Sequence, residues 1–244
     1  MQEVARGCLC VMGVVLLTGC AQPAAEVSRD DAVHDPFEAQ NRKVHAFNKK
    51  VFGKVGGGTY ARVVPTEIQD SIHNVADTLS MPQVAVNSLL QGDLRGTGIA
   101  SYRFLVNATL GIGGIADVAS EFGVEEPDTD FGETLHVWGA GEGAYLELPL
   151  LGPSTQRDAA GRVVDLFTDP LGYVLEEPDK YAPTAIKLVD KLGKGSRRSE
   201  AIGDVLNNSA DSYAQARLIY LQNRRYELRG GSTDLPEYED PYAQ

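Results

Sequence analysis

Residues 93–116, DLRGTGIASYRFLVNATLGIGGIA, decide the fold, because they predict a helix that runs directly into an apolar, glycine-rich segment. Asp93 stands where a helix N-cap is expected, and the helix should extend to about Thr109. Its apolar side chains recur at spacings of three and four, as on one face of a helix: Ile99, Tyr102, Val106 and Leu110.

Two segments are glycine-rich and apolar at the same time, TLGIGGIA (109–116) and GAGEGAYLELPLLG (139–152). Ordinary surface loops are polar. These segments are therefore either buried turns beneath helices, or they lie against lipid or line an apolar conduit, and the sequence leaves both interpretations open. For 111–114, tight backbone turns are favoured over hinge motion. The candidate loop or hinge residues are Gly111, Gly113, Gly114, Gly139 and Gly141.

The rest of the chain also has mostly helical periodicity. We expect helices at 36–55, with Asp35 as N-cap and Gly56–Gly58 after its end, from Thr66 to about Leu79, a short one from Pro82, and at 154–168, 183–192 and about 199–229. Only Ala144–Leu148 alternates as a strand does, which is too little for a sheet. The predicted fold class is all-α, with little or no sheet.

The N-terminus carries an export signal. An apolar run follows Arg6 and ends in Leu17-Thr18-Gly19-Cys20, which matches a bacterial lipobox. Residues 1–19 are then a lipoprotein signal peptide and Cys20 is the lipidated residue, the alternative being an ordinary secretory signal that ends near a cysteine. Residues 20–34 read as a flexible tether, 35–230 as the helical domain and 231–244 as a disordered acidic tail.

The composition of the chain argues against two classes of binding partner. The formal net charge of −12 argues against nucleic acid, which calls for a basic face, and against simple attraction to anionic lipid head groups. Two of the three cysteines lie in the expected signal peptide, so no disulfide framework is expected. No further run of the sequence is apolar enough for a conventional transmembrane helix.

Signatures of catalysis are missing from the sequence. The four histidines have no metal-ligand spacing, and no HExxH, paired-cysteine or GxSxG motif occurs. Scattered carboxylates usually form a solvated face. We therefore expect no enzyme, no cofactor and no metal.

Five blocks in order resemble the MlaA family, also called VacJ lipoproteins. They are DPFEAQNRKVHAFN (35–48), VNSLLQGD (86–93), RFLVNATLGIGGIADVA (103–119), FGETLHVWGAGEGAYLELPLLGPSTQRDAAGRVVD (131–165) and SADSYAQARLIYLQNRRY (209–226). Ser212 departs from the family pattern, which often has Pro there, and this affects a local turn. The motif residues read as structural are Asp35, Pro36, Asn41, Phe47, Asn48 and Asn107.

The resemblance implies a ring of amphipathic helices embedded in one leaflet of the outer membrane and enclosing an amphipathic channel. Through it, mislocalised phospholipid would leave the outer leaflet and pass to a periplasmic lipid-carrier protein, which maintains lipid asymmetry. It also implies an outer-membrane location on the periplasmic face and a trimeric porin as neighbour. No cofactor or bond cleavage is involved.

One stripe of the last expected helix suits a lipid head group. Tyr213, Arg217, Tyr220 and Arg224 recur at helical spacing, and arginine offers paired donors to phosphate. Arg217 and Arg224 are the candidate phosphate contacts, with Tyr213 and Asp211 beside them. The alternative is that these arginines pair with acids such as Asp211 or lie on a solvated face.

Three classes of function remain to be compared. The first is lipid translocation through a membrane-embedded ring. The second is a lipid-anchored envelope adaptor or scaffold that does not conduct lipid. The third is a lipid-modifying enzyme, which would convert labelled phospholipid into a product, whereas a transporter releases it intact. The apolar glycine-rich segments favour the first, since a tethered adaptor has no need of them.

Overall fold

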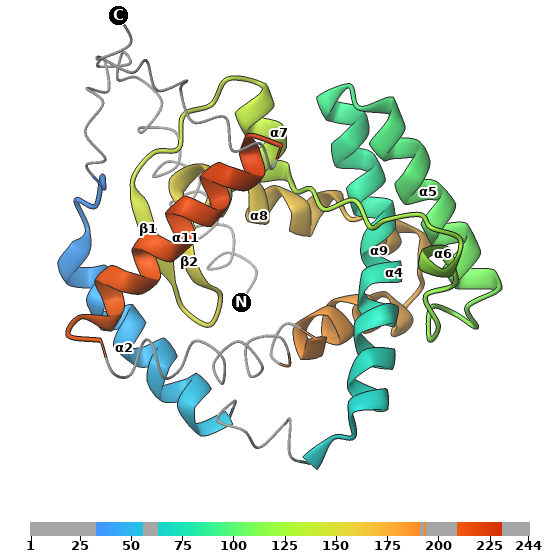
Figure 1. The fold of residues 1–244 in the computed structure, drawn as a ribbon, viewed down its shortest axis with the longest axis horizontal. Coiled ribbons are helices and arrows are strands. Elements are labelled where there is room, and N and C mark those ends of the chain that lie inside the picture. Colours follow the sequence, from blue (N-terminus) through green and yellow to red (C-terminus); the bar gives the residue numbers. More distant parts are fainter. Residues whose placement is uncertain (1–32, 56–62, 191–192, 194–208, 231–244) are drawn as a thin grey trace, which may run out of the picture. The chain divides into compact units, whose positions relative to one another are not determined.

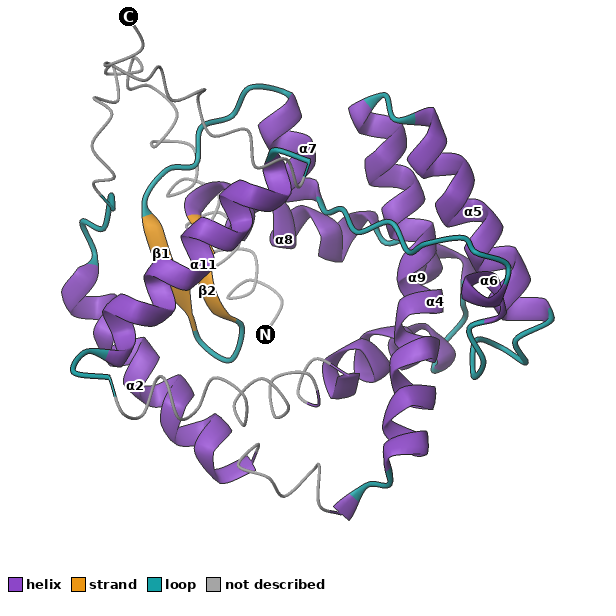
Figure 2. Cartoon of the chain, in the orientation of Figure 1, coloured by secondary structure: helices purple, strands orange, loops and turns teal. Residues whose placement is uncertain are grey.

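The computed structural model describes residues 33–55, 63–190, 193 and 209–230, and most of them are helical (Figures 1 and 2). The elements are α2 (Glu38–Val55), α4 (Thr66–Gln91), α5 (Leu94–Thr109), α6 (Val118–Glu121), α7 (Phe131–Val137), β1 (Tyr145–Leu148), β2 (Gly152–Thr155), α8 (Gln156–Thr168), α9 (Leu171–Val174), the 3-10 turn η1 (Asp179–Tyr181) and α11 (Ser212–Leu228). Residues 182–190 are also helical. The all-α prediction is confirmed. The signal peptide, Cys20, Gly56–Gly58 and the acidic tail lie outside the described residues.

Helices α4 and α5 form a hairpin whose turn is made by Gly92 and Asp93. Gly92 ends α4 in the left-handed conformation (φ 79°), and Asp93 N donates to Ser88 O at 2.9 Å. The Asp93 carboxylate then accepts from Gly96 N at 2.9 Å, so Asp93 is the N-cap of α5, as predicted. Met81 and Val84 of α4 pack with Ala100 of α5 to form the apolar core of this pair.

Pro82 lies inside α4, so the prediction of a separate short helix beginning there was wrong. A proline in a helix interior costs about 3 kcal/mol, because it removes one hydrogen bond and crowds the preceding turn. The buried side chains of Met81 and Val84, on either side of Pro82, keep both halves of α4 packed against α5. Packing therefore outweighs the local propensity.

The glycine-rich segment after α5 is a run of tight, hydrogen-bonded turns. Gly114 N donates to Asn107 O at 2.9 Å, and Ala116 N donates to Gly111 O at 3.0 Å. A Cβ on Gly111 would lie 2.2 Å from Ala116 O, and one on Gly114 (φ 91°) would lie 2.7 Å from Thr78. The backbone thus needs glycine, yet the side chain of Ile112 is 75% exposed with φ 55°, which is unusual for a β-branched residue. Tight turns and outward apolar side chains occur together here.

Asp117 connects the glycine-rich segment to α5 through side-chain hydrogen bonds. Its carboxylate accepts from Asn107 Nδ2 and Arg103 Nη2, each at 2.9 Å, and from Ser120 N, which makes it the N-cap of α6. Arg103 and Asn107 lie one helical turn apart on α5 and both are buried. Burial alone would raise the pKa of Asp117, but the hydrogen bonds from Ser120, Asn107 and Arg103 outweigh it and lower that pKa to about 2.

Strand β1 pairs with β2 in an antiparallel hairpin, from Tyr145↔Thr155 to Leu148↔Gly152. The sequence indicated only the first strand, because the Gly-Pro-Ser-Thr of β2 has no strand pattern. Its last two residues fell in the helix expected at 154–168, which begins instead at Gln156. The two strands are the one sheet in the described part of the chain.

Helix α2 covers the outer edge of β1 with two asparagines, two helical turns apart. Asn41 donates to Tyr145 O and accepts from Glu147 N, at 3.1 and 3.0 Å. Asn48 donates to Leu148 O and accepts from Leu150 N, at 2.9 and 2.8 Å. Each buried amide thus satisfies backbone groups that a neighbouring strand would otherwise bind.

Two helix starts differ from prediction. Helix α2 begins at Glu38, and Asp35 directs its carboxylate to side chains instead of capping the first turn. Helix α11 begins at Ser212 with Asp211 as N-cap, bonded to the backbone N of Tyr213 and Ala214, so the expected helix is not continuous across 209–211. The part at 199–208 lies outside the described residues.

Burial in the described residues is reversed from that of an ordinary globule. Buried side chains include many polar ones: Asn41, Asn48, Gln69, Asn87, Arg103, Asn107, Thr134, Glu147, Arg157 and Asp158. Large apolar side chains are exposed instead: Leu94, Leu105, Leu110, Ile112, Phe122, Trp138, Leu166, Phe167, Tyr173 and Val174. None of the described helices combines the length and the hydropathy that crossing a membrane requires.

Replacing Asp117 by Asn tests the anchor of the glycine-rich segment. With a folded pKa of about 2 against an ordinary 3.8, the ionised carboxylate stabilises the fold fully above about pH 5. That contribution, about 2 kcal/mol, is lost as the pH falls through the folded pKa. The gap in unfolding free energy between wild type and Asp117→Asn, measured by urea denaturation, should therefore shrink from pH 6 to pH 2. A gap that stays constant would contradict the assigned role.

Candidate functional site

Helix α11 presents one polar face to three other parts of the fold. Figure 1 shows α11 crossing the β1–β2 hairpin, with which it is in contact. Along this face Tyr213, Arg217, Tyr220 and Arg224 recur at spacings of three and four, as the sequence predicted, and each of them binds a carboxylate on another element. The stripe is therefore a row of partners for buried acids.

The first group of this row surrounds Asp35. Its carboxylate accepts from Tyr213 Oη and Arg217 Nη1, and Asn41 Nδ2 donates to it at 2.9 Å. Burial acts to raise the pKa of Asp35, but these three hydrogen bonds lower it below the ordinary value. The pKa of Tyr213 is raised by burial and by the adjacent carboxylate. The group ties the start of α2 to the start of α11.

The second group surrounds Asp158 on α8. Tyr220 Oη donates to Asp158 at 2.6 Å, and Arg224 Nε lies 3.3 Å from the same oxygen. Arg224 also binds Asp130 at 2.6 Å, and Arg157 lies 3.2 Å from the other Asp158 oxygen. Burial acts to raise the pKa of Asp158, but Tyr220 and the arginines lower it.

The predicted head-group residues are thus brought close to acids. Arg217 and Arg224 pair with Asp35, Asp130 and Asp158, none of which the sequence indicated as their partners. Asp211, the acid suggested for them, instead binds Arg42 at 2.7 Å and caps α11. The pKa of Asp211 is lowered by the Arg42 hydrogen bond first and by the helix backbone next. A role in phosphate binding stays a prediction.

Asp165 joins α8 to α4 and α7. It accepts from Gln83 Nε2 at 2.8 Å, from Asn87 Nδ2 at 3.0 Å and from Phe131 N at 3.1 Å. Burial raises the pKa of Asp165 more than these bonds lower it. Neither Gln83 nor Asn87 was expected to matter, because an amide on an amphipathic helix carries no sequence signal of its partner.

Two hollows of similar size lie in the described structure. One is an apolar groove of about 460 Å³, lined by Ile68, Ser71, Ile72, Val75, Ile115, Ala185, Ile186 and Val189. The other, the arginine-lined hollow, measures about 470 Å³ and is lined by His136, Gly139, Ala140, Gly141, Glu142, Arg157, Arg225, Leu228 and Arg229. The first belongs to α4, the glycine-rich segment and helix 182–190, and the second contains two of the predicted loop glycines.

The arginine-lined hollow has three arginines in its lining, in a chain of net charge −12. Arg225 forms a two-pronged bond to Glu142, with both N–O distances at 2.9 Å. Gly139 ends α7 with φ 88° and has open space where a Cβ would be, as does Gly141. Whether these glycines act as hinges stays a prediction.

The family profile described as MlaA lipoprotein matches residues 33–227. The chain belongs to the MlaA lipoprotein family. The matched range contains the polar face of α11, the apolar groove, the glycine-rich segments and all of the second hollow except Leu228 and Arg229.

Individual relatives agree with this assignment. The chain is 30% identical over 241 residues to the intermembrane phospholipid transport system lipoprotein MlaA of Escherichia coli, covering 96% of this chain and 92% of that protein. It is 31% identical over 201 residues to an uncharacterized protein of Rickettsia bellii, covering 81% and 78%.

A solved structure from a study of how bacterial outer membrane lipid asymmetry is maintained also matches. The TM-score is 0.67 at 29% sequence identity, and the match covers 80% of this chain and 98% of that one. The fold of the family therefore extends over most of the chain.

Replacing Arg224 by Ala tests whether the polar face of α11 holds the fold together. Its loss leaves the buried carboxylate of Asp158 without its arginine on α11, and breaking such a pair costs about 3 kcal/mol. Arg42→Ala is the matched control, since Arg42 and both its acid partners are exposed and its removal should change stability little. Urea denaturation measures both, and equal effects would contradict the structural role of Arg224.

Proposed function

We propose that the chain is an outer-membrane lipoprotein that removes mislocalised phospholipid from the outer leaflet and hands it to a periplasmic lipid carrier. The observation that carries this proposal is the reversed burial, with polar groups inside and large apolar side chains outside. In water such a surface is unfavourable, whereas against acyl chains it costs nothing. The name of the Escherichia coli relative supports the same role.

The exposed apolar residues offer a surface for one lipid leaflet. Leu105, Ile112 and Phe122 lie on α5, the glycine-rich segment and the end of α6. Helices that do not span a bilayer can lie in its interface with an apolar face toward the chains. Since each helix satisfies its own backbone groups, a ring of such helices is stable beside lipid, and we propose that arrangement.

A phospholipid has two parts with opposite requirements, and the fold offers a surface for each. The apolar groove between α4 and helix 182–190 suits an acyl chain, because nearly all its lining atoms are apolar. Arginine side chains suit the phosphate, since guanidinium binds it through paired hydrogen bonds. Arg217 and Arg224 remain the proposed head-group contacts.

The anchor and the partners complete the proposal. Acylated Cys20 would hold the chain at the periplasmic face of the outer membrane, and a periplasmic carrier would receive the lipid. A trimeric porin is the proposed neighbour in the membrane. Transport of this kind breaks no bond, so the role needs no catalytic group.

The experiment expresses the chain in a bacterium that lacks its own family member and measures phospholipid on the cell surface by chemical labelling. Wild type should lower that amount. Ile72→Asp places a charge in the groove wall and should abolish the effect, while Glu67→Lys, exposed on the same helix outside the groove, should behave as wild type.

Each alternative gives a different result. An adaptor that conducts no lipid would tolerate Ile72→Asp as long as the variant reaches the outer membrane, which fractionation measures. A lipid-modifying enzyme would release cleaved or altered phospholipid, which mass spectrometry of the labelled lipid detects.

A further inference from the structure

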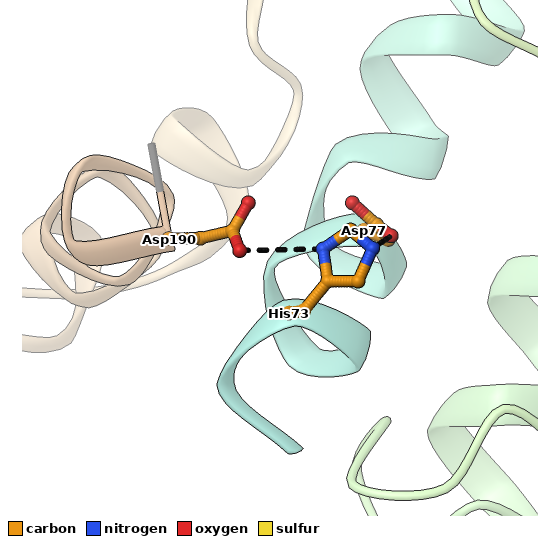
Figure 3. A group of neighbouring side chains, drawn as sticks. All are labelled: His73, Asp77 and Asp190. Carbon is orange, nitrogen blue, oxygen red and sulfur yellow. Dashed lines mark ion pairs between the residues drawn. The ribbon is translucent and has the colours of Figure 1, made fainter. Parts of the chain in front are cut away.

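Three side chains from two distant helices meet beside the apolar groove. His73 and Asp77 lie one turn apart on α4, and Asp190 comes from helix 182–190 (Figure 3). His73 Nδ1 is 3.2 Å from Asp190 Oδ1, and His73 Nε2 is 3.1 Å from Asp77 Oδ2. The sequence does not indicate this group, because its third member, Asp190, comes from a distant helix.

The imidazole is not held as an ordinary hydrogen-bonded histidine. Its Nδ1 atom is buried and forms no hydrogen bond within the described part of the chain. The Asp190 oxygen lies 3.2 Å from Nδ1, but the pair does not have the geometry of a hydrogen bond. A buried polar nitrogen in this state requires a physical reason.

A bound cation supplies that reason. In a tetrahedral site with ligands about 2.1 Å from the metal, neighbouring ligand atoms are about 3.4 Å apart, close to the separation of Nδ1 and the Asp190 oxygen. One ligand atom from each of the three residues lies within 4.8 Å of the others. An ion on Nδ1 would lie beside Asp190, and the Asp77 carboxylate, which now faces Nε2, would have to turn toward it.

We propose that His73, Asp77 and Asp190 bind a divalent transition-metal ion, with zinc as the probe. An imidazole with two carboxylates is a donor set that zinc accepts, and three protein ligands leave one position for water.

The proposed metal site lies next to both walls of the apolar groove. Ile72 and Val189 line the groove, and each directly precedes a ligand in the sequence, His73 and Asp190. A bound ion joins α4 to helix 182–190 and so fixes the two walls of the groove relative to each other. This inference concerns metal binding and does not depend on lipid transport.

The experiment measures zinc binding to the full chain in detergent by competition with a chromogenic chelator. Wild type should bind one zinc ion in this site, and zinc should raise its melting temperature. His73→Ala and Asp190→Asn should each weaken binding by about 100-fold or more, since even partners outside the metal shell account for 10- to 100-fold. His34→Ala, an exposed histidine, should bind zinc as wild type does.

All the variants carry the same cysteines, so zinc bound by thiols is common to them and does not affect the comparison. Equal zinc affinity in wild type, His73→Ala and Asp190→Asn would overturn the site. The same holds if zinc leaves the melting temperature of wild type unchanged, in which case the imidazole only bridges two carboxylates. Surface phospholipid measurements play no part in either result.

Discussion

Buried and half-buried carboxylates, each bound by arginine, tyrosine or amide donors, are the interaction on which this fold depends. Asp35 joins α2 to α11, Asp158 joins α8 to α11, and Asp117 joins the glycine-rich segment to α5. An ionised carboxylate away from water is unfavourable unless several donors satisfy it, and here each has at least three. These groups specify which elements meet, where apolar side chains would do so in a water-soluble globule.

Because many of the buried side chains are polar, large apolar side chains are exposed on the surface. The segment 110–116 shows how one sequence serves both needs, because its glycines close tight turns while Ile112 points outward. The two interpretations of this segment, buried turns or a lipid-facing loop, are therefore not exclusive. Its backbone is fixed by hydrogen bonds, and its side chains are available to lipid.

Local signals in the sequence predicted local structure well. Asp93 and the apolar spacing after it gave α5 its limits, and the spacing of Tyr213, Arg217, Tyr220 and Arg224 gave the common face of α11. Pro82 led to the wrong prediction of a separate helix, because packing on both sides of it keeps α4 continuous. The strand β2 was missed because its residues have no strand pattern of their own.

The sequence did not predict which residues each site residue binds. Nothing local indicates that Arg224 meets Asp130 and Asp158, or that His73 meets Asp190, because these pairs depend on how distant helices pack. The five family blocks supplied the function more directly than any single residue did. They mark which polar groups recur without showing which of them touch.

The exposed apolar surface can be tested with the single tryptophan of the chain. Trp138 is 57% exposed, packs edge-on against Phe131 and donates its indole N–H to Leu90 O at 3.1 Å. The decisive measurement is quenching of its fluorescence in vesicles whose phospholipid chains carry bromine. If this surface lies in the leaflet, brominated chains quench the emission strongly while aqueous iodide has little effect. Emission that iodide quenches and brominated chains leave unchanged would contradict the account.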